Sequence, residues 1–257
     1  FGEVGLDHHL LQAVAESTLL LGNGCLCCAV RGDLQQALRN LLSQRTRGEV
    51  PHFRRVVIET SGLADPSPIA YTLLSEPVLR HHFRLSGIIT TVDAVNGASQ
   101  LAEFAEAVKQ VSMADRLVVT KTDLSDAQSL ASLRVRLRVL NGSAQILEST
   151  EIRGAVHQVL TDDIYDAAGK FREARHWVAE EVDAGAADHT AGVASFVVVF
   201  DRPLDWTAFG VWASMLLHRH GADVLRLKGL LNVAGVPTPV LINGVQHIVH
   251  PPSHLEQ

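Results

Sequence analysis

Three cysteines stand within four positions of one another, in the run Gly22-Asn23-Gly24-Cys25-Leu26-Cys27-Cys28. Thiolates are soft ligands that bind zinc and similar transition metals, and the glycines before them permit the tight turn that such ligation needs. Because the chain has only three cysteines, a bound metal needs a carboxylate, a histidine or water to complete its shell. The motif predicts an open, exchangeable metal site made by Cys25, Cys27 and Cys28. The alternative is a buried or redox-sensitive thiol cluster.

A second candidate site begins at Glu59, which follows the apolar run Val56-Val57-Ile58. In nucleotide hydrolases, a carboxylate at the end of a buried strand holds Mg²⁺ directly or through water. Gly62, three positions later, can offer its backbone N–H to a γ-phosphate. The pattern predicts a catalytic role for Glu59 and Gly62 in phosphoryl chemistry. The alternative is a surface carboxylate that caps a turn.

A third motif, Thr120-Lys121-Thr122-Asp123, also follows an apolar run. It looks like the guanine-recognising Asn-Lys-x-Asp tetrad of GTPases, with Thr120 in the place of Asn. The carboxylate of Asp123 can accept hydrogen bonds from N1–H and the 2-amino group of guanine, which adenine cannot donate. The stem of Lys121 can lie over the plane of the base. The alternative is an ordinary Lys–Asp surface pair on a loop.

The elements that would position these motifs alternate between strands and helices over the first 150 residues. Apolar residues recur at Leu34, Leu38, Leu41 and Leu42, which is the spacing of a buried helix face. Alternating strands and helices favour an α/β fold with a mostly parallel sheet, whose ligands bind at the carboxyl ends of the strands. We expect strands at residues 55–58, 85–92, 116–120 and 144–147, and helices at 32–42, 65–74, 100–111 and 127–140.

A different organisation is expected after a helical stretch at 151–178. Residues 179–193 are small and polar, as in a linker. The remainder predicts a smaller α+β module: a β-rich run at 194–200, a helix at 205–220 with Asp205 as its N-cap, and strands at 224–233 and 239–249. Three aromatic residues and a leucine at helical spacing are expected in the core: Trp206, Phe209, Trp212 and Leu216. We therefore expect domains at 1–178 and 194–257.

Composition narrows the classes of function. The net charge of −6 disfavours binding to nucleic acid and to anionic membranes. Apolar residues make up 47% of the chain, but no apolar run approaches the roughly 20 residues that span a bilayer. The chain opens without the features of a signal peptide. Cysteines confined to one short motif do not form a disulfide framework, so we expect a reduced, cytoplasmic protein without membrane or nucleic-acid partners.

Taken together, the thiol motif and the two strand-end motifs resemble the CobW family of P-loop GTPases and metallochaperones. The resemblance covers nearly the whole chain, and the Cys-x-Cys-Cys motif is its most specific part. It is carried by these segments: Phe1-Gly2-Glu3-Val4-Gly5, Gly22 to Cys28, Glu59-Thr60-Ser61-Gly62-Leu63-Ala64-Asp65-Pro66, Thr91-Val92-Asp93-Ala94, Thr120 to Asp123, Lys228-Gly229-Leu230-Leu231 and Asn243-Gly244-Val245-Gln246-His247.

The resemblance implies a GTPase that binds a transition metal, zinc or cobalt, and delivers it to a client apo-metalloprotein. Glu3 would join the cysteines as a metal ligand. Glu59 and Gly62 would lie by Mg²⁺ and the γ-phosphate, and Lys121 and Asp123 would recognise guanine. GTP would order the loops that carry the metal ligands, and hydrolysis would relax them.

One departure from the family concerns the P-loop Gly-x-x-x-x-Gly-Lys-Thr, which lies upstream of the Phe-Gly-Glu segment in the family and is not found in this chain. We therefore expect the parent protein to be the GTPase, and the chain as written to bind GTP poorly and not to hydrolyse it. Two other hypotheses remain open: a nucleotide-independent metal-binding or thiol-redox module, and a structural adaptor that binds a partner through residues 194–257.

Overall fold

Buried apolar runs form a three-stranded parallel sheet, of β1 (Ile89–Asp93), β2 (Arg116–Thr120) and β3 (Gln145–Glu148), in the order β1-β2-β3. The computed structural model describes residues 29–152, 154, 156–161, 193, 196–221, 223–245, 248–249 and 252–254. Among these residues, those up to Arg84 and those from Leu85 onward form two separate compact units. The sheet belongs to the second unit, and it confirms the predicted parallel α/β fold.

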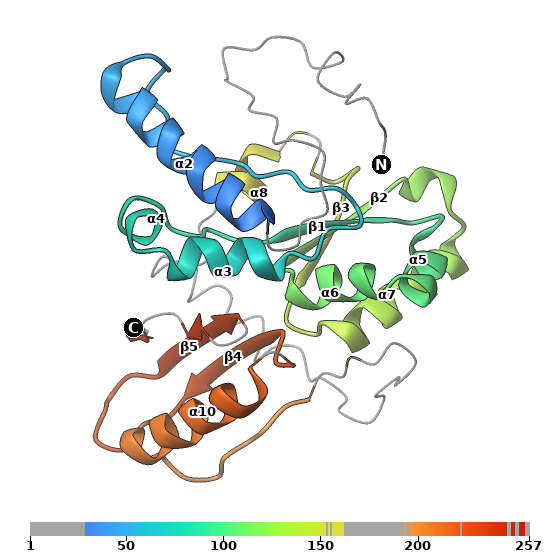
Figure 1. Ribbon diagram of the computed structural model, residues 1–257. Helices are drawn as coiled ribbons and strands as arrows, with labels where there is room; N and C mark the ends of the chain where they lie inside the picture. The colour runs from blue at the N-terminus through green and yellow to red at the C-terminus, as the bar shows by residue number, and fades with distance from the viewer. Residues whose placement is uncertain are drawn as a thin grey trace. The chain divides into compact units, whose positions relative to one another are not determined.

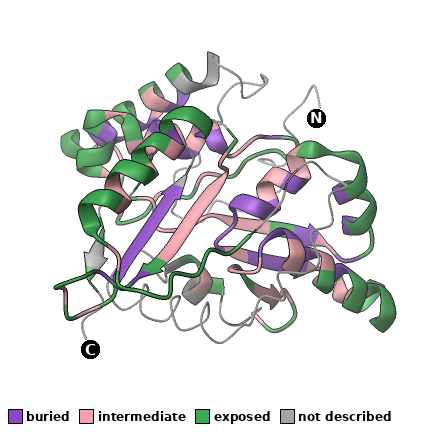
Figure 2. Cartoon of the chain, turned by 90° about the horizontal axis from the view of Figure 1, so that it is seen from below, coloured by how far each residue is buried: buried purple, intermediate pink, exposed green. Residues whose placement is uncertain are grey.

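Three helices cover one face of this sheet: α5 (Gly97–Glu103), α6 (Ala105–Met113) and α7 (Ala127–Leu140) (Figure 1). Leu101, Val108 and Leu137 project from them into a core that also contains Leu117 and Val119 of β2. Buried residues lie along the strands and the inner sides of the helices, and exposed residues lie on the outer sides (Figure 2). Two short elements complete this region, the 3₁₀ turn η1 (Thr122–Leu124) and α8 (Val156–Thr161).

The predicted helix at 100–111 is wrong in one respect, since the chain forms two helices there. Phe104 lies between them with an extended backbone (φ −118°, ψ 115°), and it is both the C-cap residue of α5 and the N-cap residue of α6. The predicted helix at 127–140 is confirmed as α7, in which Asp126 accepts a hydrogen bond from the backbone N–H of Ser129 at 2.9 Å.

A second, antiparallel sheet lies toward the C-terminus. It consists of β4 (Arg226–Leu231), β5 (Val240–Val245), β6 (Ile248–Val249) and β7 (Ser253–His254), and β5 pairs with each of the other three. Leu231, Val233, Val240 and Ile242 form a small core beside Phe209 of helix α10 (Trp206–His220). The predicted α+β module is confirmed in these elements. The predicted linker lies outside the described residues except for Val193.

Two predictions about this module are wrong. Residues 196–200 of the β-rich run form no strand, and Phe196 and Val199 are 81% and 80% exposed. β-branched and aromatic residues favour strands because they fit a half-buried pleated surface, and this run has no such surface against it among the described residues. Trp206 and Trp212, expected in the core, are half-exposed. The ring of Trp206 stacks on Phe209, with 6.1 Å between the centroids, and the ring of Trp212 is tilted against Phe209 at 5.6 Å.

The first unit contains α2 (Ala29–Arg47), α3 (Ser67–Ser75) and α4 (Pro77–His82). Leu34, Leu38 and Leu79 are its buried centre. The expected strand at 55–58 is wrong: this segment forms no ladder with any described neighbour, and a strand exists only where backbone groups pair. Its side chains nevertheless alternate, since Val56 and Ile58 pack on the helices while Val57 is 65% exposed.

Helix starts in this unit follow local capping chemistry. α3 begins two residues later than expected, at Ser67, whose backbone N–H donates to the carboxylate of Asp65 at 2.8 Å. Helix α4 was not predicted, although Glu76 and Pro77 form a recognisable start: the Glu76 carboxylate accepts from the N–H of Leu79 at 2.6 Å. Hydrogen bonds accepted by the side chains of Asp65 and Glu76 thus account for where α3 and α4 begin.

A buried ionic cluster ties β4 to the start of β2. The Asp115 carboxylate forms ion pairs with Arg226 and, at 3.5 Å, with Lys228. It also accepts the backbone N–H of Ile88 at 2.9 Å. The side chain of Asp115 is 1% exposed and those of the two cations are 8% exposed. Since charges at this depth need close partners, the cluster fixes β4 relative to the parallel sheet.

Replacing Asp205 with Ala is expected to destabilise the C-terminal module by about 1 kcal/mol. Asp205 is the N-cap of α10, and its carboxylate accepts from the N–H of Ala208 at 2.8 Å, so the change leaves that donor without its cap. The midpoint of urea unfolding measures the loss. Asp201→Ala, which removes an exposed carboxylate outside the helix, is the control, and an equal shift in both variants would contradict the capping role.

Candidate functional site

The carboxyl ends of β1 and β2 lie side by side, because Asp93 is the register partner of Thr120. The backbone N–H of Ala94 donates to the carbonyl of Thr120 at 2.9 Å, and the hydroxyl of Thr120 donates to the carbonyl of Val92 at 3.3 Å. Thr120, predicted to stand in the place of the Asn of a guanine-recognising tetrad, therefore links the two strand ends.

Lys121 follows with a left-handed backbone, φ 57° and ψ 32°. It is the single non-glycine residue with positive φ in the part of the chain that the structure describes. A left-handed conformation costs an L-residue about 1–2 kcal/mol, and such strain concentrates at functional sites. The turn ends β2 abruptly and starts the 3₁₀ turn η1, which carries Asp123.

The ammonium group of Lys121 is held by Asp93, with 2.7 Å between Nζ and Oδ2. The other oxygen of Asp93 accepts the backbone N–H groups of Val95 and Asn96, at 2.8 and 3.1 Å, and the Asn96 side chain donates to Oδ2 at 3.1 Å. The hydrogen bond from Lys121, together with those backbone donors, holds the pKa of Asp93 far below its usual range despite partial burial. The ion pair therefore persists at neutral pH.

Asp123 differs from Asp93 in its surroundings. It is exposed, and its carboxylate has no hydrogen-bond or ion-pair partner among the described residues. The two strand ends thus present one carboxylate that is fully engaged within the protein and one that is available to a ligand. An exposed carboxylate beside a fixed lysine can accept hydrogen bonds from two adjacent donors of a planar ring.

The proposed phosphate-side residues lie in the first unit. Gly62 lies in an exposed turn that is closed by the N–H of Ala64 on the carbonyl of Ser61 at 3.0 Å, and Glu59 is exposed just before it. A Cβ added at Gly62 would meet nothing within 4 Å, so no neighbouring side chain crowds this position. An exposed carboxylate is a suitable oxygen ligand for Mg²⁺.

The predicted metal ligands, Glu3, Cys25, Cys27 and Cys28, lie outside the described residues. Within the part of the chain that the structure does describe, no three His, Cys, Asp or Glu side chains gather as a metal site. The same part contains no helix long and apolar enough to cross a membrane. The expected metal site therefore stays a prediction.

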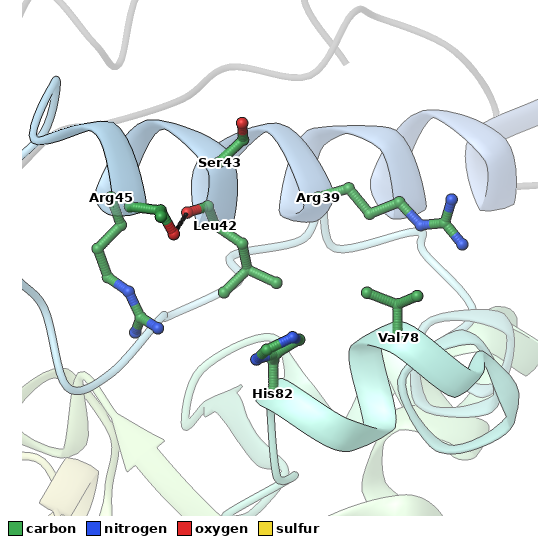
Figure 3. Close-up of a pocket in the computed structure, with 7 residues that line it drawn as sticks. Arg39, Leu42, Ser43, Arg45, Val78 and His82 are labelled. Atoms are coloured by element: carbon green, nitrogen blue, oxygen red, sulfur yellow. Dashed lines mark hydrogen bonds between the residues drawn. The ribbon is translucent and has the colours of Figure 1, made fainter.

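A pocket of about 330 Å³ lies between α2 and α4 (Figure 3). Three of its polar side chains already have partners inside the unit: Arg39 pairs with Glu76, Arg45 lies 5.0 Å above the ring of Phe53, and the Thr46 hydroxyl donates to the carbonyl of Leu42. The pocket contains none of the residues that the sequence motifs single out. It is lined by Arg39, Leu42, Ser43, Arg45, Thr46, Val78 and His82.

Sequence reasoning missed the part that Asp93 plays at this site. Asp93 lies 28 positions before Lys121, and only the register of two parallel strands brings them together. The sequence contained a signal for this pair, since the acidic Asp93 ends β1 and the basic Lys121 directly follows β2. Carboxyl ends of adjacent parallel strands share one edge of the sheet, so charged residues there can pair.

Comparison with known proteins identifies the family. Residues 1–148 match the CobW/HypB/UreG nucleotide-binding domain, and residues 193–257 match the cobalamin synthesis protein CobW C-terminal domain. The zinc chaperone YjiA of Escherichia coli is 34% identical over 255 residues, which are 96% of this chain and 76% of that protein. The zinc-regulated GTPase metalloprotein activator 1 of Schizosaccharomyces pombe is 34% identical over 167 residues, 62% of this chain and 39% of that protein.

The fold agrees with these matches. The crystal structure of Zn(II)-bound YjiA GTPase from E. coli superposes with a TM-score of 0.64 at 28% identity, covering 86% of this chain and 67% of that one. The two family matches follow each other along the chain in the order of the parallel sheet and the antiparallel module. The chain therefore belongs to the CobW/HypB/UreG family of nucleotide-binding proteins, among its CobW-type GTPases.

Proposed function

We propose that the protein is a GTP-dependent metal chaperone, which binds a transition metal through its Cys-x-Cys-Cys motif and couples delivery to GTP binding and hydrolysis. The observation that carries the proposal is the available carboxylate of Asp123 beside the fixed Lys121 at the end of β2. The names of its relatives, zinc chaperones and a GTPase metalloprotein activator, favour zinc as the cargo, with cobalt as the other candidate.

Recognition of guanine is assigned to the tetrad. Asp123 accepts N1–H and the 2-amino group, the stem of Lys121 lies over the base, and Thr120 keeps the ends of β1 and β2 together. Adenine presents no donor pair to Asp123, so it would leave the carboxylate desolvated and unmatched. This asymmetry makes the site selective for GTP over ATP.

The phosphate end is assigned to Glu59 and Gly62. Glu59 would hold Mg²⁺ directly or through water, and the backbone N–H of Gly62 would donate to the γ-phosphate. Bound Mg²⁺ would supply neutralisation of the phosphate charge. The turn at Gly62 is exposed and lies between Glu59 and α3, so a contact with the γ-phosphate would be transmitted to the start of that helix.

Metal capture is assigned to Cys25, Cys27, Cys28 and Glu3. Three thiolates and a carboxylate complete a four-ligand shell, and the carboxylate makes the site easier to open than four thiolates would be. The thiol motif directly precedes α2 in the sequence, so a change in the segment before this helix would alter the ligand geometry. GTP binding would in this way favour capture, and hydrolysis would favour release.

The remaining assignments follow from this function. The cargo would pass to a client apo-metalloprotein in the reducing environment of the cytoplasm, which keeps the thiols available. We assign nucleotide and metal binding to a domain of residues 1–178, and the C-terminal module of residues 194–257 follows a linker at 179–193. No role for nucleic acid or membrane is proposed.

Metal titration of the intact protein tests the coupling. With Mg²⁺ and a non-hydrolysable GTP analogue, zinc is expected to bind more tightly than without nucleotide. Cys27→Ala with Cys28→Ala is expected to abolish tight binding, because only one thiolate remains. Asp123→Asn is the matched control: it keeps the metal ligands but should lose the response to the GTP analogue.

The alternative functions give different outcomes in the same titration. Zinc affinity that is equal with and without nucleotide would show that the two sites are not coupled, and would favour a nucleotide-independent metal-binding or thiol-redox module. Unchanged zinc affinity in the double cysteine variant would contradict the assigned metal site.

A further inference from the structure

Two carboxylates, those of Asp93 and Asp123, lie near the carboxyl ends of β1 and β2, and they differ in their hydrogen-bond partners. Asp93 accepts four hydrogen bonds, from Val95, Asn96 (twice) and Lys121, and its side chain is 14% exposed. Asp123 is exposed and accepts none from the described residues. One carboxylate is thus built into the protein while the other is left for a ligand.

The side chain of Lys121 needs a partner to fix its direction. Lys121 has a strained backbone, and its side chain is 56% exposed, so packing alone does not fix its direction. A free lysine side chain loses up to about 2 kcal/mol of conformational entropy when it is ordered. The ion pair with Asp93 restricts the side chain before any nucleotide arrives, which lowers the entropy that binding must overcome.

We propose that Asp93 is a positioning residue of the guanine site: its carboxylate fixes the ammonium group of Lys121, so that the stem of this lysine is held in place as a platform for the base. The proposal rests on the proposed function of the tetrad and adds to it a residue from a different strand. Asp93 does not touch the nucleotide in this account; it acts through Lys121.

The turn that follows Asp93 fixes the position of its carboxylate. Its Oδ1 accepts the N–H groups of Val95 and Asn96, which closes a turn at the start of α5, and Asn96 also supports Oδ2. Gly97 follows, where an added Cβ would lie 2.8 Å from Cγ1 of Val92. The loop from β1 to α5 is therefore closely packed, and Asp93 can hold Lys121 in a defined place.

Asp93→Asn keeps the hydrogen bonds of this side chain to the backbone of the turn and removes its pairing with Lys121. The Asn oxygen can still accept the backbone N–H groups of Val95 and Asn96, but the NH₂ group in the place of Oδ2 can accept neither from the ammonium of Lys121 nor from the Asn96 side chain. In the intact protein, we expect about five- to tenfold weaker binding of GDP, measured with a fluorescent GDP, because the charge-assisted hydrogen bond that fixes Lys121 is lost. The turnover number at saturating GTP should change little.

A double-mutant cycle with Lys121→Met shows whether the effect passes through the lysine. If it does, Asp93→Asn has no further effect on GDP affinity in the Lys121→Met background. A merely structural role would weaken binding equally in both backgrounds, and that result would overturn the proposal. Asp126→Asn is the control, since the carboxylate of Asp126 accepts hydrogen bonds from Ser129 at the start of α7 and does not hold Lys121.

The same experiment keeps this proposal distinct from the proposed function. If the wild-type protein does not prefer GDP over ADP, the guanine site itself fails, and Asp93 has nothing to position. If the wild type prefers GDP and Asp93→Asn binds it with unchanged affinity, only the role of Asp93 is overturned.

Discussion

Replacing Asp123 with Asn is expected to transfer the base preference of the protein from guanine to xanthine. The affinity for GTP should fall about 100-fold, because the Asn NH₂ group would face the 2-amino group of guanine, two donors opposite each other. Xanthine keeps N1–H but has a carbonyl at position 2, so the Asn oxygen and NH₂ group match it. Competition of GTP, XTP and ATP against a fluorescent nucleotide measures the change.

The expected change of base preference requires that the carboxylate of Asp123 be available to the nucleotide. Its exposed carboxylate has no partner among the described residues, so exchange to Asn breaks no interaction that the structure describes and the fold should be unaffected. Asp126→Asn, three positions later, should leave all three affinities unchanged. If Asp123→Asn still prefers GTP to XTP, Asp123 does not recognise the base, and the guanine assignment of the tetrad is wrong.

The parallel sheet was predictable because local pattern and burial agree there. Residues 116–120 form a short apolar run between helical segments, and β2 occupies the same five positions. The N-cap at Asp205 was predictable for a similar reason, since a carboxylate before a helical pattern satisfies N–H groups that the helix leaves without partners. Information contained in a few consecutive residues was enough in both places.

The strands expected at 55–58 and 194–200 were wrong predictions, since the described residues 55–58 and 196–200 form no strand. Their composition favours strands, but a strand also requires a neighbour with which to pair, and composition says nothing of the neighbour. The pairing of Asp93 with Lys121 depends on register across 28 residues, and that of Asp115 with Arg226 spans 111 residues. Such contacts are properties of the assembled sheet, which no short motif encodes.

Removing the carboxylate of Asp115 is expected to have the largest effect on stability. Asp115→Ala leaves two buried cations, Arg226 and Lys228, without their shared carboxylate and removes the acceptor for Ile88 N–H. Breaking a buried ion pair from one side costs about 3–5 kcal/mol, since the desolvation penalty of the remaining charge is no longer offset. Urea unfolding at neutral pH measures the free-energy change.

Arg226→Met should cost less than Asp115→Ala, and this order tests the explanation. After Arg226→Met, the carboxylate keeps Lys228 at 3.5 Å and the N–H of Ile88 at 2.9 Å, so it is not left alone, and methionine fills part of the vacated volume. Arg202→Met, at an exposed site, controls for the loss of an arginine. Equal losses in Asp115→Ala and Arg226→Met would mean that the Asp115–Arg226 pair alone carries the stability. Losses below about 1 kcal/mol in both variants would mean that β4 is held to the parallel sheet by other contacts.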